Sequence, residues 1–152
     1  MADMTIREHM RERLRAEADP EYREFHSRLL PGITGIVGVR TPVLRTLAKE
    51  LLKGDWKEYI SQVSAAWKAE GQGEDGVYYD ELILWGLCIC KGFKKWEDAA
   101  PYITGFIPAI NNWAVCDIFC GSLKMAGRYR QEAWEFIQPY LESAQEYEIR
   151  FG

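Results

Sequence analysis

The sequence predicts an all-α fold, an α-solenoid or superhelix of stacked antiparallel helix pairs. Apolar residues recur at helical spacing through most of the 152-residue chain, between recognisable helix start and stop signals. Candidate capping residues near Asp75, Asn111 and Ser143 are 36 and 32 residues apart, a spacing typical of HEAT-like repeats. Because the units share little sequence, an ordinary helical bundle is the plainer alternative.

The first two helices are expected at residues 5–18 and 21–30. Apolar residues follow the helical period in the first of them, and Pro20 separates the two. Residues 31–38 contain three glycines among apolar residues, a composition that suits turns better than a helix. We therefore expect a loop there, and it is the one place where a short strand could lie.

The next two helices are expected at residues 41–53 and 55–69. Thr41 is interpreted as an N-cap residue, because a proline follows it in the first turn. Asp55, with a glutamate three residues later, is interpreted as the start of a capping box. The polar, glycine-rich residues 70–76 then predict an exposed, mobile connector.

The second half of the chain is expected to form five helices. They are predicted at residues 77–91, 95–107, 112–125, 129–141 and from 143 onward. The last opens with a capping-box pattern, Ser143 to Glu146, yet the sequence ends at Gly152 after barely two turns. So short a helix has few contacts to hold it. We therefore expect residues 1–152 to form a single HEAT-like helical-repeat domain, truncated at its C-terminus.

Charge is distributed unevenly along the chain. The net charge is −4, which disfavours a domain that binds nucleic acid by charge alone. Residues 90–130 nevertheless carry an excess of three positive charges, between two negative stretches. The basic residues of this segment are Lys91, Lys94, Lys95, Lys124, Arg128 and Arg130.

Neither a membrane nor a metal is expected as a partner. The N-terminus is charged, and no apolar run approaches the length of a signal sequence or a membrane span, so we expect a cytoplasmic protein. The CxC and CxxxC spacings do not suit zinc, and the cysteines are interpreted as small apolar residues. These are Cys88, Cys90, Cys116 and Cys120. His9 and His26 have charged neighbours and are expected to be solvated, and no cofactor motif occurs.

The most unusual residues lie in the helix expected at residues 112–125. At 100° per residue, Trp113, Asp117 and Lys124 fall within about 40° of one another, apart from the main apolar face. If this stripe lines a concave surface, an aromatic platform, a carboxylate and a cation face one cavity. In the alternative interpretation Trp113 packs under the preceding loop and Asp117 binds a neighbouring repeat.

Four segments together resemble successive motifs of AlkD-like DNA alkylation repair enzymes, which are HEAT-like repeat DNA glycosylases. The motifs correspond to the N-terminal portion of the proteins in that family. They occur in the family's order and span nearly the whole chain. The segments are 38–42 (GVRTP), 78–81 (YYDE), 112–117 (NWAVCD) and 147–152 (YEIRFG).

The resemblance implies a glycosylase that hydrolyses the N-glycosidic bond of cationic N3- and N7-alkylpurines in double-stranded DNA, and a full-length protein that is a monomer. By motif position, Trp113 and Asp117 correspond to the family's active-site residues, and Arg150 corresponds to its cleft arginine. The second cleft tryptophan of the family would lie beyond Gly152.

The chemistry suits these residues. An alkylated purine is already a good leaving group, so catalysis chiefly requires stabilisation of an oxocarbenium-like sugar, which Asp117 can supply. Trp113 can stack on the cationic base, and Arg150 and Lys124 can hold a phosphate.

Further basic residues are candidates for DNA phosphate contacts. They are Lys91, Lys94, Lys95, Arg128 and Arg40. The three lysines also suit the C-terminal end of a helix dipole, and Arg40 also suits contacts within the protein. Tyr79 or Glu81 is expected to be structural, and a tyrosine that faces the cleft is the alternative. Two other functions stay open: a non-catalytic module that binds distorted DNA or RNA, and a protein-interaction solenoid.

Overall fold

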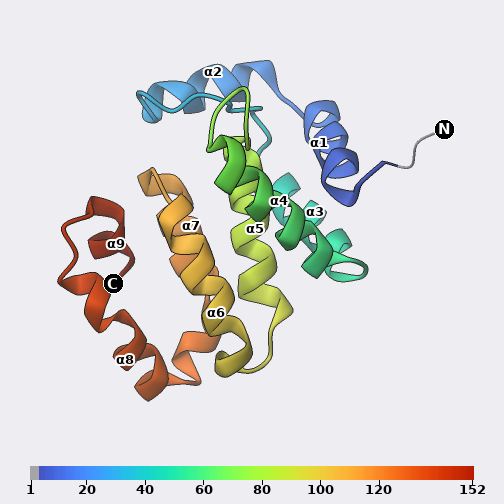
Figure 1. Cartoon of the computed structure of the whole chain (residues 1–152). Helices are drawn as coiled ribbons and strands as arrows, with labels where there is room; N and C mark the ends of the chain where they lie inside the picture. The colour runs from blue at the N-terminus through green and yellow to red at the C-terminus, as the bar shows by residue number, and fades with distance from the viewer. Residues whose placement is uncertain (1–3) are drawn as a thin grey trace. The chain divides into compact units, whose positions relative to one another are not determined.

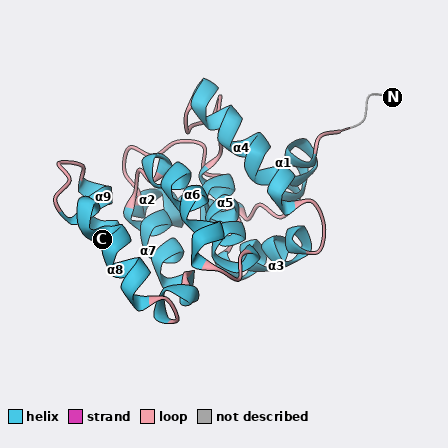
Figure 2. Ribbon diagram, turned by 60° about the horizontal axis from the view of Figure 1, so that its bottom comes forward, coloured by secondary structure: helices cyan, strands magenta, loops and turns pink. Residues whose placement is uncertain are grey.

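The computed structural model describes residues 4–152, and its regular secondary structure is entirely helical (Figures 1 and 2). The all-α prediction is therefore confirmed for these residues. Residues 31–38 form a loop without a strand, and the one isolated β-bridge joins Gln72 to Val77. Residues 1–3, part of the charged N-terminus noted above, lie outside the described residues.

Backbone contacts divide the chain into two compact units, which meet in sequence between Cys88 and Ile89. The expectation of a single domain over residues 1–152 stays a prediction. Within residues 4–152, no helix combines the length and the apolar composition that crossing a membrane requires.

The N-terminal unit contains four helices and most of a fifth. These are α1 (Ile6–Ala16), α2 (Pro20–Leu29), α3 (Thr41–Leu52), α4 (Trp56–Glu70) and α5 (Tyr79–Gly92), of which the part up to Cys88 belongs to this unit. Both α1 and α3 pack against α4. Residues 79–88 of α5 are buried throughout, so this helix forms the centre of the core.

The helix starts in this unit agree only in part with the predicted caps. The N-cap residue of α3 is Arg40, and Thr41 is already in the first turn with the proline after it. Asp55 is the N-cap residue of α4, as predicted, but its side chain makes no capping hydrogen bond, so the predicted capping box does not form. A capping box does form at α1, where Thr5 and Glu8 bind each other's backbone N–H groups. A cap depends on the path of the incoming chain, which residue types alone do not specify.

The two glycine-rich segments of this unit pack against each other. A Cβ atom on Gly35, which has a φ of 72°, would lie 2.6 Å from the carbonyl carbon of Gly73, so only glycine fits there. Tyr79 N–H donates to the Gly35 carbonyl oxygen over 3.0 Å. The connector at residues 70–76 is therefore a packed turn: Glu74 and Asp75 are exposed as expected, whereas Gly76 is buried.

The C-terminal unit begins with the end of α5. It continues with α6 (Trp96–Phe106), the 3₁₀ turn η1 (Ile107–Ala109), α7 (Trp113–Ser122), the 3₁₀ turn η2 (Lys124–Gly127), α8 (Arg130–Leu141) and α9 (Glu146–Phe151). Figure 1 shows α9 beside α7 and α8, and it contacts both. Phe151 anchors α9, because its buried ring lies 5.2 Å from that of Tyr140 and 6.1 Å from that of Phe119.

Three expectations for this unit are wrong. The short last helix does not lack contacts, since Phe151 holds it. It begins at Glu146 rather than at residue 143, because the Ser143 hydroxyl bonds Glu148 and the Gln145 N–H instead of forming a capping box. The helix expected at 112–125 ends at Ser122, so Lys124 lies in a 3₁₀ turn and not on the predicted helical stripe.

Candidate functional site

The candidate site is built on α7, whose start is fixed by Asn112. The side-chain oxygen of this buried residue accepts the Val115 N–H over 2.9 Å, and its amide donates to Asn111 over 2.9 Å. An N-cap of this kind satisfies one of the donors that a helix start leaves unpaired. It sets the helix so that Trp113 is the first residue of α7.

The two faces of α7 differ in burial as the sequence predicts. Its buried residues are Ala114, Val115, Cys116, Phe119 and Ser122. Phe119 packs on Phe106, with ring centroids 4.8 Å apart. Trp113 and Asp117, one turn apart, are both exposed, and Trp113 retains 40% of its surface. An aromatic ring and a carboxylate therefore share one accessible helix face.

Arg150 of α9 binds Asp117 in a bidentate ion pair. Its Nε donates to Oδ1 over 2.8 Å and its Nη2 to Oδ2 over 2.7 Å. The Asp117 side chain remains 49% exposed and that of Arg150 46% exposed. The structure thus brings together three residues that the sequence singled out: Trp113, Asp117 and Arg150.

The ion pair stabilises the charged form of the carboxylate. Hydrogen bonding from Arg150 lowers the pKa of Asp117, and the same contact raises the pKa of Arg150. Asp117, ionised at neutral pH as an ordinary aspartate is, therefore keeps its charge to a lower pH and is held in one orientation by two hydrogen bonds. A guanidinium has five N–H groups, and this pair uses two of them, so donors of Arg150 remain for a second ligand.

Comparison with known proteins decides the family. A family model described as DNA alkylation repair enzyme matches residues 10–152. The chain belongs to the DNA alkylation repair enzyme family. This membership confirms the resemblance seen in the four sequence motifs. No curated protein and no solved structure matches the chain.

In this member of the DNA alkylation repair enzyme family, most of the predicted phosphate-binding residues lie in the C-terminal unit and are exposed. They are Lys91, Lys94, Lys95, Lys124 and Arg128. Arg40 lies in the N-terminal unit, where its Nε binds Asp19 over 3.1 Å and its guanidinium lies 5.0 Å from the centre of the Tyr22 ring. Arg40 thus makes contacts within the protein, while its side chain remains 55% exposed.

Two cysteines of α7 border the ion pair, and the sequence analysis did not connect them with it. Cys116 and Cys120 share a hydrogen bond, which lowers the pKa of Cys116 and raises that of Cys120. Their sulfur atoms also approach the carbonyl oxygens of Tyr147 and Phe151, at 4.0 and 3.8 Å, and so help to hold α9 against α7. Cys120 is exposed, whereas Cys88, Cys90 and Cys116 are buried, as suits their interpretation as small apolar residues.

Buried polar residues of the N-terminal unit are structural. His26 is buried rather than solvated, because it bonds the Tyr79 hydroxyl over 2.8 Å and stacks on Tyr22, and burial lowers its pKa. Glu81 is buried and paired with Arg7, so the structural role expected for Tyr79 or Glu81 is confirmed. No group of three His, Cys, Asp or Glu side chains is placed to hold a metal within residues 4–152.

Proposed function

We propose that this chain is the catalytic scaffold of a DNA glycosylase that excises cationic N3- and N7-alkylpurines from double-stranded DNA in the cytoplasm, and that its helices stack as HEAT-like repeats in a solenoid. One observation carries the proposal: an exposed, ionised carboxylate, Asp117, is held by Arg150 on the same helix face as the exposed ring of Trp113. The family membership supports a role in alkylation repair.

In the proposed reaction, the bond between the purine nitrogen and C1′ breaks, and its electron pair neutralises the cationic base. The sugar becomes an oxocarbenium-like cation, which the ionised Asp117 stabilises electrostatically. Water, oriented by its hydrogen bond to Asp117, then attacks C1′ to form the C1′–O bond and releases its proton to bulk water. No general acid is required, because the leaving base is already positively charged.

The neighbouring residues position the substrate. The exposed face of Trp113 stacks on the cationic base or the deoxyribose. Arg150 keeps the carboxylate oriented with two N–H groups and binds a DNA phosphate with others. Outside this centre, backbone phosphates are held by the further basic residues. These are Lys124, Arg128, Lys91, Lys94, Lys95 and Arg40.

The decisive experiment is replacement of Asp117 by asparagine, which keeps the size of the side chain and removes its charge. Release of alkylpurine from methylated duplex DNA should fall by about 100-fold or more, a loss typical of removing one transition-state-stabilising group. Asp98→Asn is a matched control, because Asp98 is an exposed acid in the first turn of α6 in the same unit. Wild-type release by a folded Asp117→Asn variant would show that the role given to Asp117 is wrong.

The ion pair also favours a second candidate, a module that binds distorted DNA or RNA without cleaving it. A carboxylate already paired with Arg150 has part of its charge compensated, which weakens its action on a developing cation. This second function predicts salt-dependent binding of damaged duplex by the wild-type chain, with no release of base at any protein concentration.

A further inference from the structure

A surface cavity of about 350 Å³ lies in the N-terminal unit, away in sequence from the residues of the candidate site. The residues that matter for its chemistry are Arg15 of α1, Arg23 of α2, Tyr78 just before α5, Glu74 of the connector, and the backbone of Gly35 and Val37. Two cations and a phenol therefore share this cavity with a single carboxylate.

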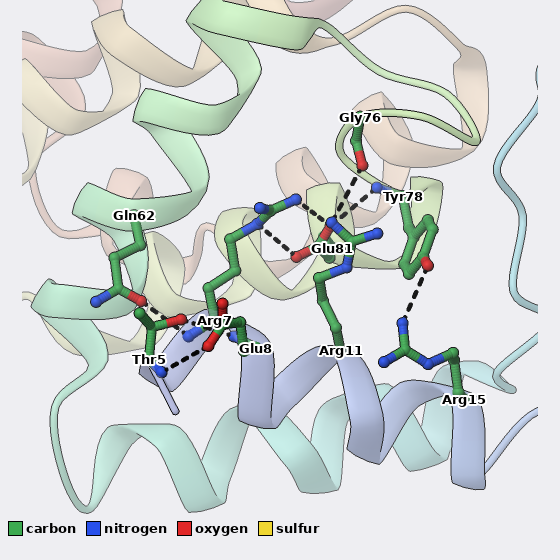
Figure 3. Close-up of polar contacts among 9 residues, drawn as sticks. All are labelled: Thr5, Arg7, Glu8, Arg11, Arg15, Gln62, Gly76, Tyr78 and Glu81. Carbon is green, nitrogen blue, oxygen red and sulfur yellow. Dashed lines mark hydrogen bonds and ion pairs between the residues drawn. The ribbon is translucent and has the colours of Figure 1, made fainter. Parts of the chain in front are cut away.

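The phenol of Tyr78 lies between two guanidinium groups of α1 (Figure 3). Arg15 Nη1 donates to the Tyr78 hydroxyl over 3.1 Å, and the guanidinium of Arg11 lies 4.0 Å from the centre of its ring. Arg11 also donates to the Gly76 carbonyl over 3.4 Å. The two arginines, Arg11 most and Arg15 next, lower the pKa of Tyr78, so the local field favours negative charge at this point.

The two arginines of the cavity differ from other arginines of the same helices. Arg13 of α1 binds Glu50 over 2.8 Å, and Arg28 of α2 binds Glu24 over 2.6 Å. Within residues 4–152, neither Arg15 nor Arg23 has a carboxylate within ion-pair distance. Both are exposed, so their positive charges are available to an anion at the cavity.

The wall of the cavity is held in place by buried contacts. The Asp80 carboxylate accepts the Val37 N–H over 2.7 Å and the Val39 N–H over 3.0 Å. A Cβ atom on Gly38, which has a φ of 94°, would lie 2.5 Å from the Arg23 Cβ, so α2 approaches the loop as closely as glycine permits. Arg23 therefore stands beside a loop whose position is already fixed, and ligand binding needs little reorganisation.

We propose that this cavity binds one phosphate of a DNA backbone, so that the N-terminal unit makes its own contact with the substrate. Arg15 and Arg23 donate to the non-bridging oxygens of the phosphate, and the Tyr78 hydroxyl, which accepts from Arg15, donates its own proton. Glu74 opposes additional negative charge, which limits the cavity to one phosphate. The inference rests on the proposed function insofar as it takes DNA as the ligand.

The test measures binding of methylated duplex DNA over a range of salt concentrations. The variant Arg15→Ala/Arg23→Ala removes the two available cations, and Arg13→Ala/Arg28→Ala removes two arginines of the same helices that are already paired. Because one phosphate contact is lost, the slope of log K against log salt should become shallower by about 1. The affinity should fall about tenfold near 0.1 M salt, and the matched control should keep the wild-type slope.

Two single substitutions sharpen the test. Tyr78→Phe keeps the ring beneath Arg11 but removes the hydroxyl, and should weaken binding a few-fold. Glu74→Gln removes the opposing charge and should strengthen binding. The outcomes separate this inference from the proposed function: equal slopes for the two double variants overturn the phosphate site alone, whereas a folded wild-type chain that binds no duplex overturns both.

Discussion

A buried arginine–carboxylate pair in the N-terminal unit and an exposed one in the C-terminal unit share a bidentate geometry and differ chiefly in burial. In the N-terminal unit, Arg7 binds Glu81 over 3.0 and 3.3 Å, and the side chains are 16% and 0% exposed. In the C-terminal unit, Arg150 binds Asp117 over 2.8 and 2.7 Å, with both side chains nearly half exposed. The same kind of contact therefore holds the fold together at Arg7–Glu81 and remains accessible to a ligand at Arg150–Asp117.

The physical cause of the difference is solvation. The buried Glu81 carboxylate contacts Arg7 and the Tyr78 N–H, which donates to it over 2.9 Å, in place of water. Removal of Arg7 would therefore leave a buried charge that is poorly compensated. Asp117 keeps its contact with water, and loss of its partner is largely screened. The comparison leads to four predictions.

The largest effect is expected for Arg7→Ala. The variant should lose about 3 kcal/mol of unfolding free energy, because it leaves Glu81 buried with one backbone donor. Urea denaturation followed by circular dichroism measures the loss. Arg13→Ala, which breaks the exposed pair with Glu50 on the same helix, should leave the midpoint almost unchanged. Equal midpoints for the two variants would contradict the distinction between buried and exposed pairs.

The next effect is expected for Trp113→Ala, which tests whether the accessible face of α7 serves the substrate. Loss of stacking on the base should reduce alkylpurine release about tenfold and change stability little. The control is Trp134→Ala on α8, because Trp134 is 57% exposed and is not among the proposed substrate contacts. A similar loss of release in both variants would indicate a general effect of removing surface aromatics.

Arg150→Ala should have a smaller effect on the fold. The thermal midpoint should stay within about 2 °C of the wild type, since the pair is exposed. Without Arg150, the pKa of Asp117 should rise towards its ordinary value. As the pH is lowered, the rate of base release should therefore start to decrease at a higher pH in the variant than in the wild type. A pH–rate profile of both proteins measures this shift. If the rate of base release decreases at the same acidic pH in both proteins, Arg150 does not control the ionisation of Asp117 on which release depends.

The smallest effect concerns His26. Burial lowers its pKa in the folded protein, so below the ordinary value of about 6.5 the unfolded chain binds more protons than the folded one. The unfolding free energy should therefore decrease as the pH falls through this range. Denaturation midpoints measured between about pH 5 and 8 should show a weaker dependence in His26→Gln. The exposed His9 provides the control, because His9→Gln should retain the wild-type dependence.

Helix positions were largely predictable from the sequence, whereas their ends were not. Helical spacing of apolar residues depends only on local geometry, and it located every α-helix among residues 4–152. The caps predicted at Thr41 and Ser143 were wrong, and Asp55 is the predicted N-cap without the predicted hydrogen bond. A capping hydrogen bond also needs the incoming chain to place an oxygen near a particular N–H. Burial of His26 was missed for a related reason, since its partner Tyr79 is distant in sequence.

By itself, the sequence determined the helical class, the family motifs and the shared helix face of Trp113 and Asp117, because each follows from residue order and the helical period. Only the tertiary structure decided that Arg150 meets Asp117 and that Arg7 meets Glu81, since both pairs join helices far apart in the chain. It also decided which pair is buried. Burial depends on packing around the whole unit, and it is burial that separates an ion pair that stabilises the fold from one accessible to a ligand.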